Sequence, residues 1–255
     1  MERFSELAIV LRNIPYKERD RIVTFITENQ GKITGIAKGG THSRRFAGAL
    51  DFLSCSKVQF TRKPHNELVF LDEAEVHYEF LIHKDFERFI AASFAAELCL
   101  RVLEAQAPCR DEFVIFSNFL FQLKEESGMP LIPALTAFLV KSLAVMGYSP
   151  SVLRCVQCHK GVHEIDIDKN VFWDARSGGI ICFECNGGVK RTVIRESSLF
   201  CYQAMVLKSF KDLAKDKFEI ENVKSLLLLL VDFIIHHVPG VSEFKSWTLL
   251  NEILQ

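Results

Sequence analysis

Four cysteines in two closely spaced pairs are the residues of this sequence best suited to a recognisable kind of chemistry. Both pairs have the spacing CxxC, and their members are Cys155, Cys158, Cys182 and Cys185. Two residues between cysteines let a tight turn aim both sulfurs at one point, and two such turns complete the tetrahedral thiolate shell that Zn²⁺ prefers. Because this shell leaves no position for an activated water, the spacing predicts one structural zinc ion rather than a catalytic one.

The segment around these cysteines does not match the pattern of a zinc deaminase, the closest enzymatic alternative. Such an enzyme needs an H-x-E motif and a later P-C-x-x-C motif. Here Glu164 follows His163 directly, and Ile181 precedes Cys182. No Ser/His/Asp arrangement and no carboxylate pair stands out elsewhere in the sequence. Four more cysteines stand alone in apolar surroundings, where a free cysteine behaves as a small buried hydrophobe: Cys55, Cys99, Cys109 and Cys201.

Basic residues are concentrated near the start of the chain. The formal net charge of the 255 residues is −1, yet residues 12–63 contain eleven Lys and Arg against four Asp and Glu. This local excess of positive charge suggests a surface that binds a polyanion. Basic residues that only keep a surface soluble are the alternative interpretation.

Residues 7–80 have the pattern of a small β-barrel. Short apolar segments, often alternating with polar residues, predict five strands over residues 7–11, 21–27, 32–37, 52–60 and 68–78. Five strands in about 80 residues suggest an OB-fold, which binds oligonucleotides on its strand 2–3 face and through its first and fourth loops. On this strand count, basic residues fall in the first loop (Arg12, Lys17 and Arg19) and in the fourth (Arg62 and Lys63).

The sequence KGGTHSRR at residues 38–45 is a second candidate for phosphate binding. Its glycines could expose backbone N–H groups to an anion, and its arginines could hold phosphate oxygens in a bidentate manner. A flexible connector is an equally good interpretation, because the GxxxxGK[ST] spacing of a nucleotide-binding loop is absent. With Lys32, these regions give our candidate nucleic-acid contacts: Arg12, Lys17, Arg19, Lys32, Lys38, Arg44, Arg45, Arg62 and Lys63.

After residue 84 the apolar residues recur at helical spacing. The periodicity predicts helices over about residues 85–106, 111–126, 131–146, 197–214, 219–237 and 242–254. Since none can bury its apolar stripe alone, we expect one helical domain over residues 83–255 after a barrel domain over residues 1–82, an α+β fold. The zinc segment, residues 154–187, is inserted in the helical domain. We expect its Val171–Trp173 and Ile180–Cys182 to pair as a hairpin whose tryptophan covers the zinc, with base stacking as the alternative role.

The start of the sequence, the length of its apolar runs and its cysteines favour a cytoplasmic protein. The start, MERFSELAIVLR, lacks the apolar core and the cleavage site of a signal peptide. The longest apolar run, from Leu226, is far shorter than the roughly 20 residues that cross a bilayer, so no membrane span is expected. Eight cysteines without an export signal fit reduced thiols and metal binding better than disulfides.

Several short motifs follow one another in a distinctive order. The first are Thr27-x3-Gly31-Lys32-Ile33 and Gly35-x2-Lys38-Gly39-x3-Ser43-Arg44-x3-Gly48. Next come Met146-Gly147-Tyr148-Ser149-Pro150 leading to Arg154-Cys155-Val156-x-Cys158, then Gly178-Gly179-x2-Cys182-x2-Cys185, and finally Phe244-Lys245-Ser246-Trp247-x2-Leu249. Each motif is modest by itself, but their order and spacing are specific. Across nearly the whole chain they resemble the RecO recombination mediators of bacteria.

This resemblance implies an N-terminal OB-fold joined to a helical domain with a zinc knuckle. It implies a mediator in DNA repair, not an enzyme. Such a mediator binds single- and double-stranded DNA, anneals complementary strands and helps load the RecA recombinase onto DNA coated with single-stranded DNA-binding protein. The implied partners are RecR and the C-terminal tail of that binding protein, and the implied location is the nucleoid. Because that tail is acidic and apolar, a cation beside apolar helix surface should contact it, and Lys141 is our candidate.

The chain departs from the family pattern in one loop. Residues 39–45 are less basic than the Gly-Ala-Arg-type run common in the family, so DNA contact should depend more on Arg44, Arg45 and the first and fourth loops. Two other classes of function remain as alternatives. One is a zinc-dependent enzyme that processes nucleic acids, and the other is an adaptor that binds only proteins.

Overall fold

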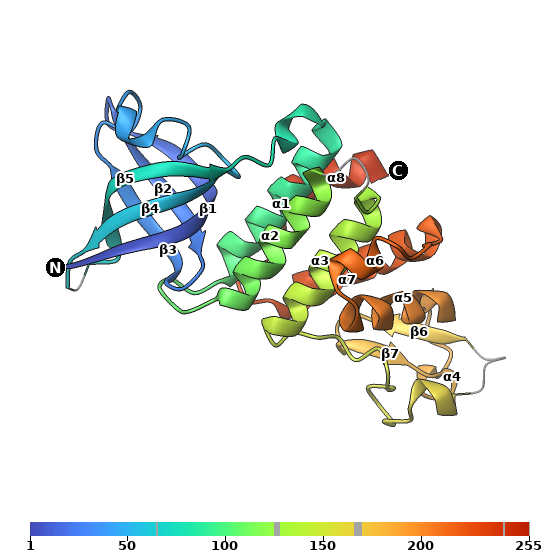
Figure 1. The fold of residues 1–255 in the computed structure, drawn as a ribbon. Helices are drawn as coiled ribbons and strands as arrows, with labels where there is room; N and C mark the ends of the chain where they lie inside the picture. Colours follow the sequence, from blue (N-terminus) through green and yellow to red (C-terminus); the bar gives the residue numbers. More distant parts are fainter. Residues whose placement is uncertain (65, 125–127, 166–169, 242, 255) are drawn as a thin grey trace. The chain divides into compact units, whose positions relative to one another are not determined.

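The computed structural model describes residues 1–64, 66–124, 128–165, 170–241 and 243–254, whose fold is shown in Figure 1. By its contacts the chain divides into two compact units. The first consists of Met1–Lys124 and Phe244–Gln255, and the second is Glu125–Glu243. In the sequence, the second unit is therefore inserted between two parts of the first. The boundary between domains at residue 82 stays a prediction.

The first unit begins with a closed five-stranded barrel. Its strands are β1 (Glu2–Tyr16), β2 (Asp20–Thr27), β3 (Gly31–Ala37), β4 (Cys55–Arg62) and β5 (Leu68–Tyr78). Around the barrel they follow the order β1-β2-β3-β5-β4, with β3 and β5 parallel and the other neighbours antiparallel. This arrangement confirms the predicted OB-fold, and the helices that follow it confirm the α+β class.

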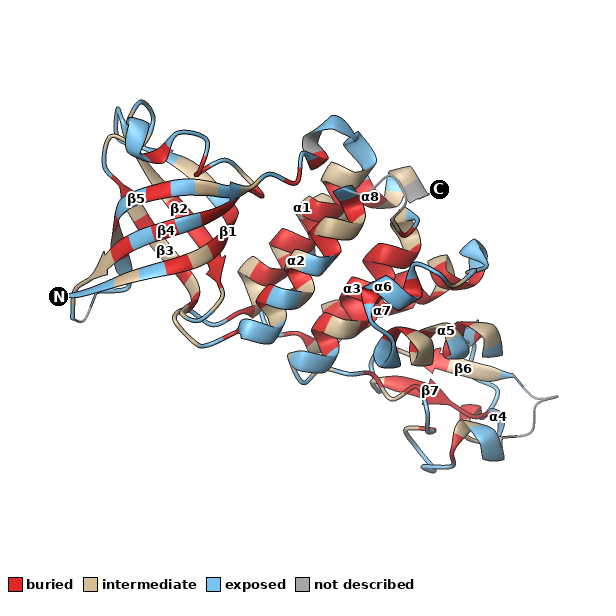
Figure 2. Cartoon of the chain, viewed as in Figure 1, coloured by how far each residue is buried: buried red, intermediate tan, exposed pale blue. Residues whose placement is uncertain are grey.

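Alternation of side chains explains why these segments form a barrel. On β3 every second residue from Gly31 to Ala37 is buried, whereas Lys32, Thr34 and Ile36 between them are partly exposed. Figure 2 shows buried and exposed positions alternating along β4 as well. The barrel interior is filled by apolar side chains, among them the fully buried Phe25, Ile33 and Phe60. Burial of this one face fixes the register of each strand, since a shift by one residue would expose it.

Strand β1 is longer than predicted, because one strand serves two neighbours. Its first half pairs with β4 and its second half with β2, and the register shifts between Val10 and Arg12. Only the buried middle of the strand carried an apolar signal. As a consequence Arg12 lies on β1, paired with Thr24, and not in the first loop as predicted. Likewise Arg62 is the last residue of β4 rather than part of the fourth loop.

Three helices complete the described part of the first unit: α1 (Phe86–Val102), α2 (Arg110–Lys124) and α8 (Lys245–Leu254). The side chain of Asp85 accepts a hydrogen bond from the Arg88 backbone N–H and so caps α1. The carboxylate of Glu97, on α1, accepts hydrogen bonds from the backbone N–H groups of Lys245 and Ser246 at 3.1 and 3.0 Å. It therefore caps the start of α8. The predicted helix end at residue 126 and helix start at residue 242 lie outside the described residues.

The β2–β3 hairpin packs directly against the segment that follows α1. Gly31 has a φ of +72°, and a Cβ at this position would lie 1.8 Å from the carbonyl oxygen of Ala107. Next to it, the backbone N–H of Gln106 donates to the carbonyl of Lys32 at 2.9 Å. Only glycine allows both the left-handed conformation and this close approach. The barrel and the helices of the first unit are thus joined at a tightly packed contact.

The second unit contains the helices α3 (Leu131–Val145), α5 (Glu196–Leu207), α6 (Phe210–Leu213) and α7 (Ile220–His237). Helix α3 packs against both α5 and α7, and Phe138 and Leu230 are fully buried in these helices. The single helix predicted over residues 197–214 is in fact two, because Lys208 is extended and the Ser209 side chain caps α6. Short 3₁₀ helices lie at Arg44–Phe46, Ile82–Lys84 and Val162–Glu164. Within the described residues, no helix combines the length and apolarity needed to cross a membrane.

Candidate metal centre and nucleic-acid interface

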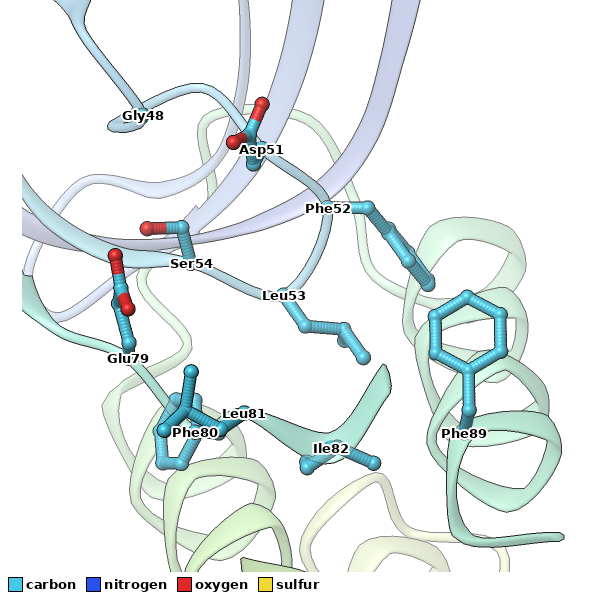
Figure 3. Close-up of a pocket in the computed structure, with 10 residues that line it drawn as sticks. All are labelled: Gly48, Asp51, Phe52, Leu53, Ser54, Glu79, Phe80, Leu81, Ile82 and Phe89. Carbon is cyan, nitrogen blue, oxygen red and sulfur yellow. The ribbon is translucent and has the colours of Figure 1, made fainter. Parts of the chain in front are cut away.

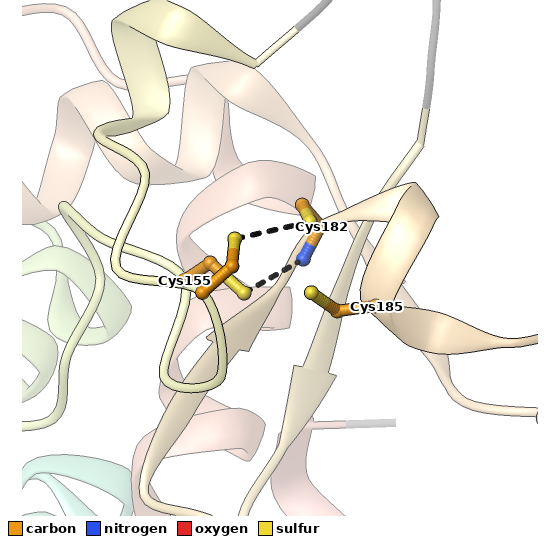
Figure 4. Close-up of side chains that lie close together, drawn as sticks. Cys155, Cys182 and Cys185 are labelled. Carbon is orange, nitrogen blue, oxygen red and sulfur yellow. Dashed lines mark hydrogen bonds between the residues drawn. The ribbon is translucent and has the colours of Figure 1, made fainter.

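The four predicted metal ligands converge in the second unit. The sulfur atoms of Cys155, Cys158, Cys182 and Cys185 all lie within 4.8 Å of one another, and Figure 4 shows the side chains that meet there. The sulfurs of Cys158 and Cys182 are 3.7 Å apart. In a tetrahedral shell with Zn–S bonds of about 2.3 Å, neighbouring sulfurs would be about 3.8 Å apart. The cluster therefore has the donor type and the spacing to hold a metal ion.

The first pair of cysteines lies on a tight turn. The backbone N–H of His159 donates to the carbonyl of Cys155, and the N–H of Cys155 donates to the carbonyl of Lys160, each at 2.9 Å. The turn closes because His159 takes the left-handed conformation, with a φ of +62°. Its side chain is exposed, and the group of possible metal ligands found among the described residues contains only the cysteines. His159 is thus a turn residue.

The second pair lies where a strand runs into a short helix. The strand is β7 (Gly179–Ile181), the helix is α4 (Phe183–Asn186), and Cys182 is the residue between them. Strand β6 (Val171–Asp174) pairs antiparallel with β7, as predicted for the hairpin. A further strand, β8 (Thr192–Ile194), pairs with the other edge of β6 and was not predicted, because it is short and largely exposed. Residues 166–169 of the predicted zinc segment lie outside the described residues.

The thiols of the cluster differ in how easily they ionise. Burial raises the pKa of Cys155, but backbone N–H groups of Cys158, Cys182 and Gln157 outweigh this effect and lower the pKa to about 6. Burial instead raises the pKa of Cys182. The protein thus favours the thiolate of Cys155, and a bound cation is needed to make the Cys182 sulfur anionic as well. Soft thiolate donors of this kind select metals such as zinc.

Trp173 of the hairpin belongs to the core of the second unit. Its side chain is only 4% exposed, and its ring meets Phe233 of α7 edge to face, with centroids 6.4 Å apart. His237, one turn further on α7, contacts the carbonyl of Ala175 through Nε2 at 2.5 Å. These contacts fasten the hairpin to α7, so the tryptophan does not offer a face for base stacking.

The first loop and the loop after β3 lie side by side on the barrel. The backbone N–H of Thr41 donates to the carbonyl of Arg19 at 3.1 Å, and the N–H of Gly39 donates to the carboxylate of Asp20 at 2.8 Å. Two predicted regions are therefore brought together from separate parts of the sequence. Their exposed basic side chains are those of Lys17, Arg19, Lys38, Arg44 and Arg45.

We had considered that the glycines of the loop after β3 expose free N–H groups to an anion. In the structure they do not. The N–H of Gly40 donates to Ala37, and the N–H groups of His42 and Ser43 both donate to Gly39. This tight turn satisfies its own backbone donors. Any phosphate contact made by the loop must come from its side chains.

The two arginines of the loop after β3, Arg44 and Arg45, differ in how far their side chains are held by hydrogen bonds. Arg45 donates through Nη1 to the carbonyl of Asp72 at 3.1 Å and through Nη2 to that of Lys38 at 3.5 Å, so it partly holds the loop. Arg44 is exposed, and its side chain makes no hydrogen bond or ion pair in the part of the chain that is described.

Three other predicted contacts are occupied within the protein. The ammonium of Lys32 donates to the carbonyl of Leu100 at 2.7 Å, near the end of α1. That of Lys141 donates to the carbonyls of Met205 and Lys208 at 2.7 and 2.6 Å. Burial lowers the pKa of both lysines.

Arg62 is the third predicted contact residue that is occupied within the protein. Its guanidinium packs over the ring of Phe4 at 4.8 Å. Its Nη1 reaches Gln30 at 3.3 Å, while Nε and Nη2 are buried without a partner among the described residues. The hydrogen-bond partners of these three residues lie more than 30 positions away in the sequence, so no local signal could have identified them.

A small cavity of about 140 Å³ lies in the first unit, next to the start of α1. Figure 3 shows carboxylates of Asp51 and Glu79 at its wall, with apolar side chains such as Phe52 and Phe89 beside them. The two phenylalanine rings meet edge to face, with centroids 5.8 Å apart. Because its lining carries acidic but no basic side chains, this cavity does not suit a phosphate.

Sequence reasoning missed one aromatic residue among the basic ones. The ammonium groups of Lys63 and Lys38 lie 4.9 and 5.8 Å from the centre of the Phe70 ring, on β5. The alternation along β5 predicts that this ring faces outward, but nothing in the sequence places the lysines of two other loops around it.

Known proteins resemble the chain along nearly its full length. The family model "Recombination protein O N terminal" matches residues 1–80, and "Recombination protein O C terminal" matches residues 83–248. A DNA repair protein RecO from Anaeromyxobacter sp. (strain K) is 32% identical over 195 residues, which are 76% of this chain and 74% of that protein. The one from Syntrophus aciditrophicus (strain SB) is 28% identical over 255 residues, covering 96% and 93%. This chain therefore belongs to the RecO family of DNA repair proteins.

Proposed function

We propose that this chain is a recombination mediator that binds single- and double-stranded DNA and anneals complementary strands. It would help to load RecA onto DNA coated with single-stranded DNA-binding protein, with RecR and the tail of that binding protein as partners. The observation that supports DNA binding most is the junction of two barrel loops through Thr41 and Arg19. It gathers exposed cations that have no carboxylate partner among the described residues: Lys17, Arg19, Lys38 and Arg44.

The chemistry of this surface suits the phosphate backbone rather than the bases. Each lysine or arginine that neutralises a phosphate releases a condensed counterion, which favours binding of any sequence. Two strands held by their phosphates keep their base edges free, so pairing between the strands supplies the sequence recognition. The barrel itself needs no catalytic group for this role.

The predicted contact residues are not equally suited to binding the phosphate backbone. Lys32 holds the end of α1, so we leave it out of the proposed interface. The guanidinium of Arg62 packs over Phe4, so Arg12 and Lys63 are better placed to extend the surface. We assign no residue to the tail of the binding protein, because the ammonium of Lys141 already has two carbonyl acceptors.

We further propose that the cysteine cluster holds one structural zinc ion. When bound, the zinc would supply the charge that keeps four neighbouring thiolates together. The protein contributes the two turns that aim the sulfurs, and the contacts of Trp173 and His237 connect the hairpin to α7. The metal centre therefore stabilises the second unit, and DNA is bound by the barrel.

The DNA-binding proposal is tested by removing two of the gathered arginines. In the double variant Arg19→Ala/Arg44→Ala, the slope of log K against log salt for single-stranded DNA should fall by about 1.4, since each lost phosphate contact removes about 0.7. The matched control is Arg176→Ala/Lys190→Ala, which removes the same charge from exposed positions of the second unit. Fluorescence anisotropy over a salt series measures both. Equal slopes for the two double variants would move the DNA contact away from the barrel loops.

Annealing is tested separately with two complementary labelled strands. We expect the native protein to accelerate pairing beyond the spontaneous rate, and the Arg19/Arg44 variant to lose most of this acceleration. A native protein that binds no DNA and does not accelerate pairing would contradict the proposal and leave an adaptor of proteins as the better description.

A further inference from the structure

A row of apolar side chains crosses the outer surface of the barrel. By register Ile14 on β1 pairs with Ile22 on β2, Ile22 pairs with Ile36 on β3, and Ile36 pairs with Phe70 on β5. Paired residues of neighbouring strands point to the same face. All four side chains are partly exposed, whereas Val69 and Leu71 on either side of the phenylalanine are buried. Phe70 is the aromatic end of this row.

Two lysines approach Phe70 from the strands on either side. In the barrel β5 lies between β3 and β4, and Lys38 directly follows β3 while Lys63 directly follows β4. Because β3 is parallel to β5 and β4 is antiparallel to it, the two lysines approach the ring from opposite directions along β5. Their ammonium groups lie 5.8 and 4.9 Å from the ring centre.

Neither ammonium group is neutralised by an acid. Among the described residues, Lys38 and Lys63 form no ion pair with a carboxylate. The nearest acid on the strand is Asp72, whose carboxylate accepts a hydrogen bond from the Thr61 hydroxyl at 2.8 Å. Thr61 itself pairs with Phe70 across β4 and β5. Asp72 therefore bounds the positive region at one end.

We infer that Phe70 is a stacking platform for one unpaired base, and that Lys38 and Lys63 contact the phosphates on either side of that nucleotide. This inference rests on the proposed DNA binding and narrows it to single strands at this position. An aromatic face between two cations matches a nucleotide, whose flat base lies between two negatively charged phosphates. A duplex cannot use the ring, because the faces of its bases are already covered by neighbouring pairs.

The platform gives the barrel a preference that phosphate contacts alone do not provide. Loss of one base stacked on an aromatic ring weakens binding of single strands by about 5- to 100-fold. It should leave binding of a blunt duplex nearly unchanged, since the lysines still meet phosphates. A mediator with such a platform would hold one strand with a base turned toward the protein and the next bases free to pair.

The test compares Phe70→Ala with Phe86→Ala, which removes an exposed phenylalanine at the start of α1. Anisotropy at one salt concentration measures binding of an oligothymidine, of the same strand with one central abasic site, and of a duplex. We expect Phe70→Ala to weaken binding of the intact strand by about 5- to 100-fold and to change binding of the duplex by less than about 2-fold. Phe86→Ala should match the native protein for every ligand.

Two further variants keep the test decisive if Phe70→Ala packs poorly. Phe70→Leu preserves an apolar side chain but has no aromatic face, and Phe70→Tyr preserves the ring. With a strand containing 2-aminopurine, the native protein and Phe70→Tyr should change the fluorescence of the base, and Phe70→Leu should not. Equal changes for the tyrosine and leucine variants overturn the inference.

The outcomes separate this inference from the proposed function. If the native protein binds single strands in a salt-dependent way and the Phe70 variants bind equally well, the platform alone is refuted. An apolar row that serves a protein partner would give that result. If the native protein binds no DNA at all, the proposed function fails first.

Discussion

Replacement of Glu97 should weaken the contact between the start of α8 and α1 and make this contact independent of pH. Glu97 lies on α1, 149 positions before Ser246, and accepts hydrogen bonds from two backbone N–H groups of α8. The Ser246 hydroxyl donates to the same carboxylate at 2.6 Å, and Arg101 pairs with it at 2.7 Å. We consider Glu97→Gln, which keeps the shape of the side chain, and Glu97→Ala, which removes it.

The expected magnitude follows from these contacts. An oxygen acceptor at a helix start contributes about 0.5–2 kcal/mol, and a partly exposed ion pair at i,i+4 adds about 0.3–0.5 kcal/mol. We therefore expect Glu97→Ala to lower the free energy of unfolding of the first unit by about 2 kcal/mol. Glu97→Gln retains one acceptor oxygen without its charge and should cost about 1 kcal/mol. Glu104→Gln is the control, since Glu104 is exposed and forms no hydrogen bond or ion pair with another described residue.

The sign of the pH dependence follows from the pKa of Glu97. Burial raises this pKa, but hydrogen bonds from Ser246, Arg101 and Lys245 outweigh the effect and hold it below its ordinary value of 4.5. The carboxylate therefore stabilises the fold at pH values above 4.5, and this contribution is lost as the pH falls through the lower pKa of the folded protein. The difference in stability between the native protein and Glu97→Gln should shrink accordingly.

Trp247 provides the assay, because it lies on α8 and packs against Phe94 of α1 with ring centroids 5.4 Å apart. With Trp173 replaced by phenylalanine, it is the remaining tryptophan, so urea titrations followed by its emission report on this contact. Titrations at about pH 7 and about pH 3 give the two differences. If Glu97→Gln behaves like Glu104→Gln at neutral pH, Glu97 is not the cap of α8. If its cost is equal at both pH values, the titration argument is wrong.

Two more substitutions test contacts described above. Gly31→Ala should lower the free energy of unfolding, measured in urea, by about 3 kcal/mol or more, because the new Cβ would meet the Ala107 carbonyl. Gly39 also has a positive φ but has open space around it, so Gly39→Ala should lower it by only about 1 kcal/mol. Similar losses for the two variants would contradict the close packing of the hairpin. Cys182→Ser should reduce bound zinc from about one equivalent to a small fraction, while Cys201→Ser, outside the cluster, should retain it. Elemental analysis of the purified variants decides, and equal metal contents would remove the cluster from consideration.

Features that depend on near neighbours in the sequence could be predicted. The CxxC spacing placed two sulfurs on each turn, and the four sulfurs meet as expected. Alternation along β3 and β5 identified strands with bounds within about one residue of those observed, because burial of one face imposes a period of two. In the same way Asp85 could be recognised as the residue at the start of α1, since its side chain caps its own helix.

Features that depend on distant partners could not be predicted. Lys32 has the composition of a phosphate contact, yet its ammonium binds the carbonyl of Leu100, 68 positions away. Nothing in residues 244–254 shows that their helix packs on α1 rather than on its sequence neighbours α5 to α7. Both features depend on which surfaces come into contact in the folded protein. A single sequence does not show which distant residues will be in contact.

The capping of α8 by Glu97 also orders the events of folding. Contacts between residues nearly 150 positions apart form slowly, because a long loop must close before the contact repays its entropy. The barrel strands and α1 can form their own hydrogen bonds well before this loop closes, because their partners are closer in the sequence. Collapse of the intervening segment into its own unit would shorten the distance that the chain must search. We expect docking of α8 to be the last kinetic phase of refolding, visible in Trp247 emission after the barrel has acquired its protected amides.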